Sequence, residues 1–364
     1  MRRLAVALPL VFLLPGLAAA GDRELLNAKA RYLTPTRSAF ADTPDGVQAR
    51  YDAGRDLVEG VRAAGGVSTK LRPVRDELLR IGRRQVARAE ALDRPDGSRG
   101  TGRLASLPPA VAPRGAHRPD AALRLRLELA ARSFDGWAAA WVHDLRTGRF
   151  AAWNGEERFP AASTVKLGVL VAALRTSVQP ERGRWWYDAR QIGAWSSNLG
   201  ANRISGELGL AAVSAALRRL GMRSSTYPGP YRATTGYRPP GGHTRVTTVF
   251  DLGRALYRLH ATAYGDRSTG RLLGLSQAQA QAGLRILLSA QRASDNLGLL
   301  RPWLGDLPVA EKNGWLSDTR LTAAIVYGRR GPTIVVVAAY RPGVSAFEAR
   351  QLGRRVLAVA GVNR

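Results

Sequence analysis

A serine and a lysine stand three residues apart in the segment Glu157-Arg158-Phe159-Pro160-Ala161-Ala162-Ser163-Thr164-Val165-Lys166. The apolar run 167–174 follows directly and predicts a helix that carries both side chains on one face. A serine hydroxyl is a weak nucleophile until a base takes its proton, and a desolvated lysine can act as that base. N–H groups at the helix start would stabilise an oxyanion. By itself, however, the pair also fits a serine that caps a helix.

Two further polar segments follow in the chain. Ser196-Ser197-Asn198 lies within residues 195–204, a predicted junction between a loop and a helix, and Lys312-Asn313-Gly314 directly precedes two predicted strands. The chain uses arginine for nearly all of its 55 basic residues, and its four lysines are Lys29, Lys70, Lys166 and Lys312. An ammonium can lose its proton in a protein, whereas a guanidinium effectively cannot. Two of the four lysines therefore stand where arginine could not serve as a base.

The three segments resemble, in type and order, the S-x-x-K, S-D-N and K-T-G motifs of class A β-lactamases and penicillin-binding D,D-peptidases. The resemblance covers residues 119–364 and includes Glu-Arg-Phe-Pro before the serine, Asn202 four residues after Asn198, and Thr247-Thr248 before a predicted helix. It implies that Ser163 forms an acyl-enzyme and that Lys166 helps to deprotonate it.

The same resemblance assigns roles to the other motif residues. It implies that Ser196 relays a proton to the leaving nitrogen, that Asn198 binds the substrate amide, and that Lys312 fixes the substrate carboxylate and biases Ser196. The N–H groups of Ser163 and Trp315 would form the oxyanion hole. Asn313 and Gly314 are expected to line the substrate site, with Asn202 as an auxiliary residue. No metal ion or cofactor is implied.

The chain also departs from the family pattern. Ser197 stands where the family has Asp, and Asn313 stands where it has Thr or Ser. The 33 residues from Ser163 to Ser196 are fewer than is usual in the family, which predicts a more open site. A literal Ser-Asp-Asn at residues 294–296 lies only 18 residues before Lys312, inside a predicted helix, and we take it as a coincidence.

The largest departure concerns hydrolysis of the acyl-enzyme. Class A β-lactamases place a glutamate on a loop to activate water, but residues 221–250 of this chain contain no Asp or Glu. They offer Tyr227, Tyr231, Tyr237 and His243 instead. His243 could serve as a base near neutral pH, or it could be an ordinary exposed loop histidine. Without a base, acylation would proceed and deacylation would stall.

The chain divides into four predicted parts. Residues 1–20 show the basic, apolar, small-residue order of a secretory signal peptide with cleavage after Ala20, so we expect a secreted or cell-envelope protein. A retained membrane anchor is the alternative, but Pro9 and Pro15 interrupt the apolar run. Residues 21–92 predict a helical N-terminal region, residues 93–118 a linker rich in Pro, Gly and Arg, and residues 119–364 the hydrolase domain.

The pattern of residues 119–364 predicts an α+β fold. Helices are expected at residues 121–132 and 347–360, and strands at 137–142, 149–153, 322–327 and 333–340. Strands at both ends with helices between them predict an antiparallel sheet with terminal helices packed on it and a mostly helical subdomain. This arrangement is similar to the α/β sandwich that the resemblance to β-lactamases and D,D-peptidases implies.

Composition narrows the range of functions. The chain has no cysteine, which excludes disulfides, thiolate zinc sites and a lipid-modified cysteine. Its net charge of +27 favours weak attraction to anionic envelope polymers, but no compact basic motif with aromatic residues points to nucleic acid. We expect a monomeric serine hydrolase that opens a β-lactam or related amide. The alternatives are a cell-wall D,D-peptidase, transpeptidase or esterase, and a non-catalytic envelope-binding module.

Overall fold

The computed structural model describes residues 20–33, 44–92, 104–109, 117–231, 245–290 and 298–362. The chain packs as two units, residues 1–92 and 93–364, which are considered separately. All three motifs lie in the second unit. Residues 1–19 of the predicted signal peptide, His243 and residues 294–296 lie outside the described residues.

The first unit consists of three helices, α1 (Ala20–Leu33), α2 (Pro44–Ala63) and α3 (Arg72–Leu92), with a 3₁₀ turn at Thr69–Leu71. Its small core contains Leu25, Ala28, Leu57, Val61, Ala64 and Leu78. Two glycines allow α2 and α3 to approach closely, because a Cβ atom on Gly54 would lie 2.8 Å from the carbonyl oxygen of Gly82. The helical region predicted for residues 21–92 thus consists of helices packed around one small apolar core.

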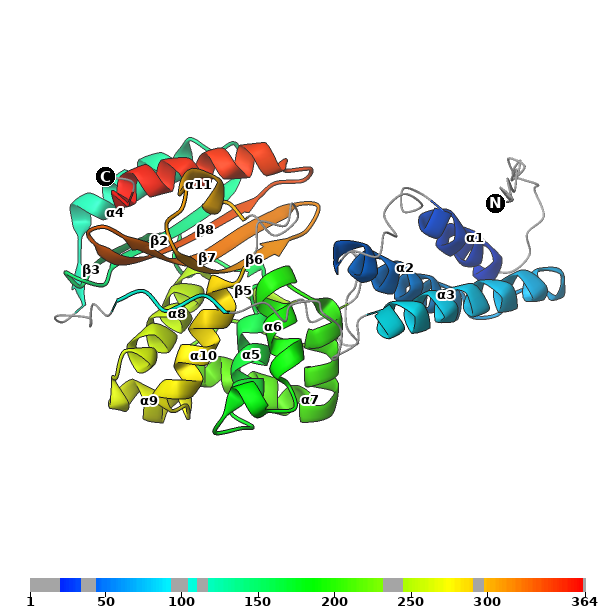
Figure 1. The fold of residues 1–364 in the computed structure, drawn as a ribbon. Helices are drawn as coiled ribbons and strands as arrows, with labels where there is room; N and C mark the ends of the chain where they lie inside the picture. The colour runs from blue at the N-terminus through cyan, green and yellow to red at the C-terminus, as the bar shows by residue number, and fades with distance from the viewer. Residues whose placement is uncertain are drawn as a thin grey trace. The chain divides into compact units, whose positions relative to one another are not determined.

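The second unit is built on a six-stranded sheet with the order β1-β3-β2-β8-β7-β6 (Figure 1). Its strands are β1 (Arg118–Pro119), β2 (Trp137–Asp144), β3 (Arg149–Trp153), β6 (Val309–Trp315), β7 (Thr319–Gly328) and β8 (Gly331–Tyr340). All pairs are antiparallel except β1 with β3. Lys312 lies inside the edge strand β6, whereas the sequence placed it just before the strands. The sequence did not predict this strand, because the polar residues from Glu311 to Asn313 interrupt the apolar pattern typical of a buried strand.

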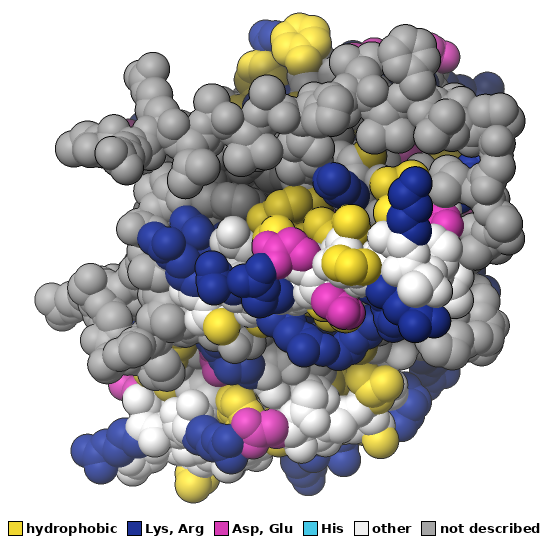
Figure 2. Space-filling model, turned by 90° about the vertical axis from the view of Figure 1, so that its right-hand side faces the viewer, with side chains coloured by type: hydrophobic (Ala, Val, Ile, Leu, Met, Phe, Trp, Pro, Cys, Tyr) yellow, Lys and Arg dark blue, Asp and Glu magenta, His cyan; other side chains and the backbone are white. Residues whose placement is uncertain are grey.

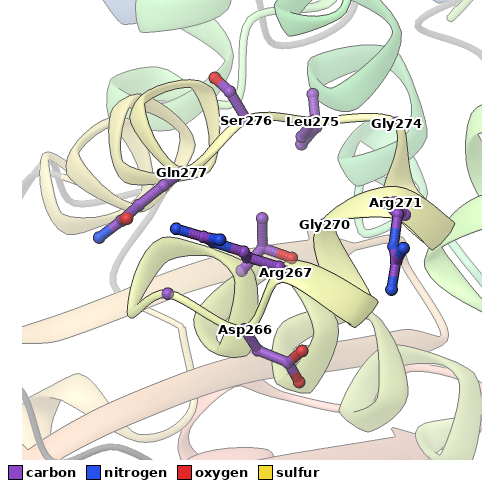
Figure 3. Close-up of a pocket in the computed structure, with 10 residues that line it drawn as sticks. Asp266, Arg267, Gly270, Arg271, Gly274, Leu275, Ser276 and Gln277 are labelled. Atoms are coloured by element: carbon purple, nitrogen blue, oxygen red, sulfur yellow. The ribbon is translucent and has the colours of Figure 1, made fainter.

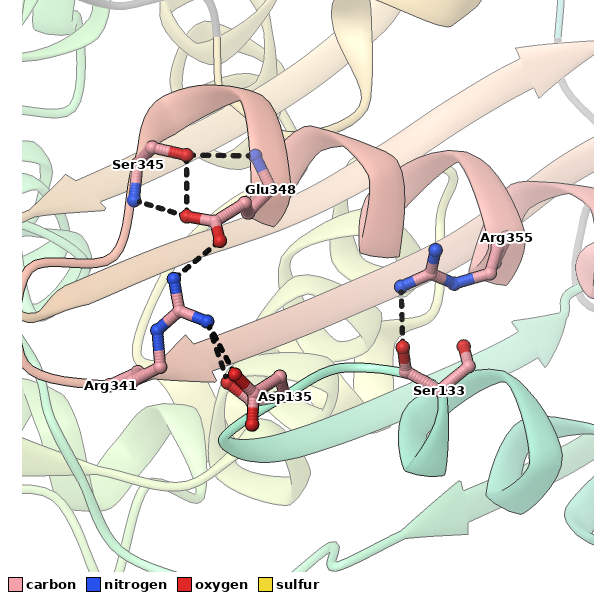
Figure 4. A network of polar contacts seen from close by, with 6 residues as sticks. All are labelled: Ser133, Asp135, Arg341, Ser345, Glu348 and Arg355. Carbon is pink, nitrogen blue, oxygen red and sulfur yellow. Dashed lines mark hydrogen bonds and ion pairs between the residues drawn. The ribbon is translucent and has the colours of Figure 1, made fainter.

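Helices α4 (Ala121–Arg132) and α11 (Ala346–Ala360) cover one face of the sheet (Figure 1). Polar contacts fasten these two helices to β8 at their ends (Figure 4). Arg341, just after β8, donates from Nη1 to Asp135 Oδ2 at 3.0 Å and also pairs with Glu348 of α11. Glu348 and Ser345 form a capping box at the start of α11.

The helical layer covers the opposite face (Figure 1). It contains α5 (Lys166–Leu174), α6 (Trp186–Trp195), α7 (Asn198–Leu220), α8 (Val249–Ala263), α9 (Arg267–Leu273) and α10 (Gln277–Leu288), with a 3₁₀ turn at Pro180–Arg182. A second 3₁₀ turn, Arg301–Trp303, packs on the other face with α11. Every residue of α5 is buried, which explains why its sequence is apolar on all sides. β4 (Phe159–Pro160) precedes α5 and pairs with β5 (Val246–Thr247) in a two-stranded ribbon.

Part of the predicted linker packs against the second unit. Leu107 contacts the core of the helical layer, and the Tyr264 hydroxyl donates a hydrogen bond to the carbonyl oxygen of Pro108 at 2.8 Å. Arg118 and Pro119 form strand β1. Residues 104–109 thus belong with the second unit, held by the packing of Leu107 and the hydrogen bond to Pro108.

The surface agrees with the excess of basic residues in the sequence. Figure 2 shows Lys and Arg side chains spread over the face drawn, among fewer Asp and Glu side chains. In the described part of the chain, no helix is both long and apolar enough to cross a membrane.

Candidate active site

Ser163 lies in the turn that leads into α5. The helix itself begins at Lys166, whose N–H donates to the carbonyl oxygen of Ser163 at 3.2 Å. The Lys166 Nζ atom nevertheless lies 3.0 Å from Ser163 Oγ. The turn is anchored to the ribbon, because the N–H of Ala161 donates to the carbonyl oxygen of Arg245 at 2.9 Å. The structure thus brings the first predicted pair together.

Two backbone positions beside this pair are strained. Ala162, directly before Ser163, has φ of 46°, and Ser196 has φ of 59°. The described residues contain only one other non-glycine residue with positive φ, Asn154. The left-handed region costs a non-glycine residue about 1 kcal/mol, and such strain concentrates at functional sites. Here one strained residue directly precedes Ser163 and the other is Ser196 itself.

The amine of Lys166 is surrounded by oxygen atoms. Its side chain is buried, and Nζ lies 3.0 Å from Ser163 Oγ and 2.5 Å from Asn198 Oδ1, with a further hydrogen bond to the carbonyl oxygen of Ser196. The last two oxygens can only accept hydrogen bonds. The 3.0 Å separation of Nζ from Ser163 Oγ is within the hydrogen-bond reach that proton transfer between the two groups requires.

Lys312 completes a chain of contacts. Its Nζ atom donates to Ser196 Oγ at 2.6 Å and to the carbonyl oxygen of Asn313 at 3.0 Å. Burial of Lys312 lowers its pKa to about 7, although the neighbouring Glu311 carboxyl opposes this shift. Ser196 therefore links the two lysines, with its backbone carbonyl facing Lys166 and its hydroxyl facing Lys312.

The register of β6 decides which groups face the site. Leu316 donates to Thr319 and Tyr327 donates to Pro308 across the β6–β7 pair, so the even-numbered residues of β6 form the hydrogen-bonded pairs. The backbone N–H and C=O groups of Asn313 and Trp315 therefore point to the open edge of the sheet. The Trp315 N–H is thus free of the β7 ladder, as an oxyanion donor must be.

Side chains alternate along the same strand. Gly314 shares the face of Lys312 and lies against the turn of the serine, since a Cβ atom on it would lie 2.9 Å from the carbonyl oxygen of Ala161. Asn313 points to the other face, where its Oδ1 accepts a hydrogen bond from Thr322 Oγ1 at 2.7 Å. The predicted substrate contact of Asn313 is therefore not available to its side chain, which fastens β6 to β7.

The start of α7 keeps its cap despite the change from the family pattern. Ser197 Oγ accepts a hydrogen bond from the N–H of Gly200 at 3.0 Å, so a hydroxyl caps the helix where the family has a carboxylate. One turn further on, Asn202 holds the backbone of Tyr231. Its Nδ2 donates to the Tyr231 carbonyl at 2.8 Å, and its Oδ1 accepts from the Tyr231 N–H at 2.6 Å.

These two hydrogen bonds hold Tyr231 at the site. The sequence did not reveal a role for this residue. The Tyr231 ring centroid lies 4.3 Å from Lys166 Nζ and 4.0 Å from Cζ of Arg245. Tyr227 packs beside it, with its hydroxyl bonded to Ser205 Oγ at 3.0 Å, and Tyr237 lies outside the described residues. The one signal in the sequence was the position of Asn202, one helical turn after Asn198.

A separate pocket of about 430 Å³ lies among α8, α9 and α10 (Figure 3). Asp266, Arg267 and Gln277 are among the residues that line it, and no motif residue does. In the described part of the chain, His, Asp and Glu form no cluster that could hold a metal ion. The four motif side chains that the structure brings together, Ser163, Lys166, Ser196 and Lys312, are called the serine–lysine cluster below.

Comparisons with known proteins agree with this architecture. The model of the β-lactamase enzyme family matches residues 122–182 and 189–359. A β-lactamase structure from Chitinophaga pinensis has 18% identity and a TM-score of 0.56, covering 67% of this chain and 100% of that one. A β-lactamase from Sphaerobacter thermophilus has 20% identity and a TM-score of 0.53, covering 65% and 97%.

The structure of PBP-A has 19% identity and a TM-score of 0.53, covering 66% of this chain and 97% of that one. A search of curated proteins found no match. The predicted α+β fold is thus confirmed by the solved structures, and the family model covers more than half of the sequence. The chain therefore belongs to the β-lactamase enzyme family, serine hydrolases that act on amide bonds.

Proposed function

We propose that this chain is an exported serine hydrolase that opens a β-lactam or related amide through an acyl-enzyme on Ser163. The observation that carries the proposal is the continuous serine–lysine cluster, in which Lys166 Nζ lies 3.0 Å from Ser163 Oγ and Lys312 Nζ lies 2.6 Å from Ser196 Oγ. Export is supported by the signal-peptide pattern of residues 1–20.

The contacts suggest a sequence of proton transfers. Lys166 accepts the proton of Ser163 as Oγ attacks the amide carbonyl carbon, and the N–H groups of Ser163 and Trp315 hold the oxyanion. The C–N bond then breaks, and Ser196 passes a proton to the leaving nitrogen. Lys312 lies on the far side of that hydroxyl, where its ammonium can bind a substrate carboxylate and replenish the proton.

Release of the acyl group is expected to be slow. Residues 221–250 contain no carboxylate, so this segment has no glutamate to activate water. Among the described residues of this segment, Tyr231 places its ring 4.3 Å from Lys166 Nζ. We therefore propose that Ser163 retains a bound β-lactam, which is penicillin-binding behaviour.

A cell-wall D,D-peptidase, transpeptidase or esterase is the second candidate. The backbone groups of Asn313 and Trp315 at the open edge of β6 favour it, because an extended peptide can add to such an edge as a further strand. A non-catalytic envelope-binding module would have no need for the buried contacts of both lysines.

Acylation can be tested directly on the purified chain. We expect a mass increase of one β-lactam on Ser163 that persists for many minutes, with slow nitrocefin turnover. Ser163→Ala should form no adduct, and Ser177→Ala, in the loop after α5, should react like the wild type. Rapid turnover would instead support an efficient lactamase, and an unreactive Ser163 would favour the binding module.

A further inference from the structure

The ring of Tyr231 is used at the site, while its hydroxyl is not. The side chain is 4% exposed, and burial raises its pKa, so the phenol is neutral. The hydroxyl oxygen is buried without a hydrogen-bond partner among the described residues. A buried polar group without a partner carries a cost. The ring face, 4.3 Å from Lys166 Nζ, therefore remains as the part of the side chain that acts.

Three contacts hold this ring in place. Asn202 binds both the N–H and the C=O of the Tyr231 backbone. Arg245 lies against the ring at 4.0 Å, and its Nη2 donates to the carbonyl oxygens of Gly229 at 2.9 Å and Pro230 at 3.0 Å. The guanidinium is thus tied to the backbone that precedes the tyrosine, and it fixes the ring against the loop.

A ring held in a fixed place can restrict the position of a lysine amine. The lysine amine ends a flexible four-carbon stem, and its electrostatic attraction to a ring face is directional. Three oxygen atoms also contact this amine, Ser163 Oγ, Asn198 Oδ1 and the carbonyl oxygen of Ser196. The ring adds a contact at 4.3 Å, which restricts the positions open to the amine. Catalytic groups must be held within about 0.5 Å of their productive position.

We propose that Tyr231 is a positioning residue for the Lys166 amine, and that Asn202 and Arg245 support it. The proposal deepens the function proposed above, because it takes Lys166 as the group that accepts the Ser163 proton. The loop segment 221–250 contains no carboxylate. It contributes the aromatic ring of Tyr231, which helps to hold the amine of Lys166.

The kinetic test compares two substitutions of the same residue. Tyr231→Phe removes only the hydroxyl, whereas Tyr231→Leu removes the ring. In Tyr231→Leu we expect the rate constant for acylation of Ser163 by a fluorescent penicillin to fall about tenfold or more, because a misplaced catalytic group costs this much. The dissociation constant of the preceding complex should stay within about twofold. Tyr231→Phe should match the wild type in both constants.

A second measurement reports position without needing activity. The chain has four lysines, so ¹³C-lysine labelling gives four resolvable side chains, assigned by single Lys→Arg substitutions. The ring current of Tyr231 should shift the Hε signals of Lys166 upfield in the wild type and in Tyr231→Phe. The shift should be lost in Tyr231→Leu, with the Lys29 and Lys70 signals unchanged.

The outcomes separate the two proposals. A shifted Lys166 signal in a protein that never acylates Ser163 would overturn the proposed function and leave the positioning role standing. Wild-type acylation and an unchanged Lys166 signal in Tyr231→Leu would overturn the positioning role, as would equal losses in Tyr231→Phe and Tyr231→Leu. If Tyr231→Leu does not fold, Arg245→Gln must reduce both the acylation rate and the upfield shift, and a wild-type result there would also overturn it.

Discussion

Lys166 and Lys312 reach the same serine through different atoms. Lys166 contacts the backbone carbonyl of Ser196, and Lys312 contacts its hydroxyl. The surroundings of the two amines differ as well, since acceptor oxygens and an aromatic ring enclose Lys166, while Lys312 has Ser196 Oγ and one backbone carbonyl. In a chain that otherwise uses arginine, the two amines are suited to separate tasks, one to accept a proton and one to carry charge and protons to the leaving group.

The charge of Lys312 should make acylation depend on pH. Burial lowers its pKa to about 7, so its ammonium is present below pH 7 and is lost as the pH rises through that value. The second-order rate constant for acylation by an anionic β-lactam should therefore fall above pH 7. Lys312→Arg should lack this descending limb, because a guanidinium keeps its charge. Stopped-flow rates from pH 5.5 to 9 test this, and an identical limb in Lys312→Arg would refute the assignment.

At the scale of elements, successive side chains of β6 point to opposite faces of the sheet. Those on one face contact the serine turn, and those on the other support the sheet. Lys312 and Gly314 face the serine turn, while Glu311 and Asn313 face the layer on the other side of the sheet, where Glu311 pairs with Arg301 at 2.7 Å. The α8 helix packs on the same sheet further along and buries His260 instead of a motif residue. A substitution in β6 therefore tests the reaction, and a substitution in α8 tests stability.

Gly314→Ala should reduce acylation. The added Cβ would lie 2.9 Å from the carbonyl oxygen of Ala161 and 3.0 Å from Thr164 Cγ2, which forces β6 away from the serine turn. Because about 1 Å of displacement can cost on the order of 100-fold in rate, we expect a drop of at least tenfold. Gly328→Ala at the end of β7 is the control, since its nearest contact would be 3.4 Å. Equal acylation rates in both variants would contradict the prediction.

Buried histidines should make the fold sensitive to acid. Burial lowers the pKa of His143 in β2 to about 4 and that of His260 in α8 to about 3. Both values lie below the 6.5 of an unfolded chain, so the unfolded state binds more protons between pH 6.5 and 4. The contribution to stability is complete above about pH 7 and is lost as the pH falls.

The comparison of wild type with His260→Leu isolates this effect. In urea titrations the wild type should lose more unfolding free energy between pH 7.5 and pH 4.5 than the variant, in which the titrating ring is absent. The carboxylates contribute equally to both proteins and cancel in the comparison. Parallel pH dependences would mean that His260 is protonated in the folded protein without cost.

At the scale of the whole molecule, the chemistry and both large cores belong to residues 93–364. The family model ends within this unit at both sides, and the solved structures cover 65% to 67% of the chain. The three-helix unit has a core of its own and contributes no residue of the serine–lysine cluster. The second unit should therefore fold and react without it.

Two truncations with different starts test this independence. A chain of residues 104–364 should acylate at the wild-type rate. A chain of residues 117–364 should react similarly but melt at a lower temperature, because it loses the packing of Leu107 and the hydrogen bond from Tyr264 to Pro108. Loss of acylation in the longer chain would show that the helical unit takes part in the reaction.

The sequence by itself determined what depends on local order. Ser163 and Lys166 are three residues apart, so a single turn brings them together whatever the rest of the chain does. The β-branched residues at 333–340 predict a strand and the apolar residues at 167–174 predict a helix. Both elements form, and such local patterns identified the fold class correctly. Even Ser197, which differs from the family, caps its helix as its residue type favours.

The tertiary structure decided what depends on distant contacts. The register between β6 and β7 turned the side chain of Asn313 away from the site, and a one-residue shift would have reversed it. Burial by several elements set the pKa of Lys312. The ring of Tyr231 met Lys166 across 65 residues of sequence because Asn202 holds its backbone. No local pattern encodes such contacts, since their energy exists only after the chain has packed.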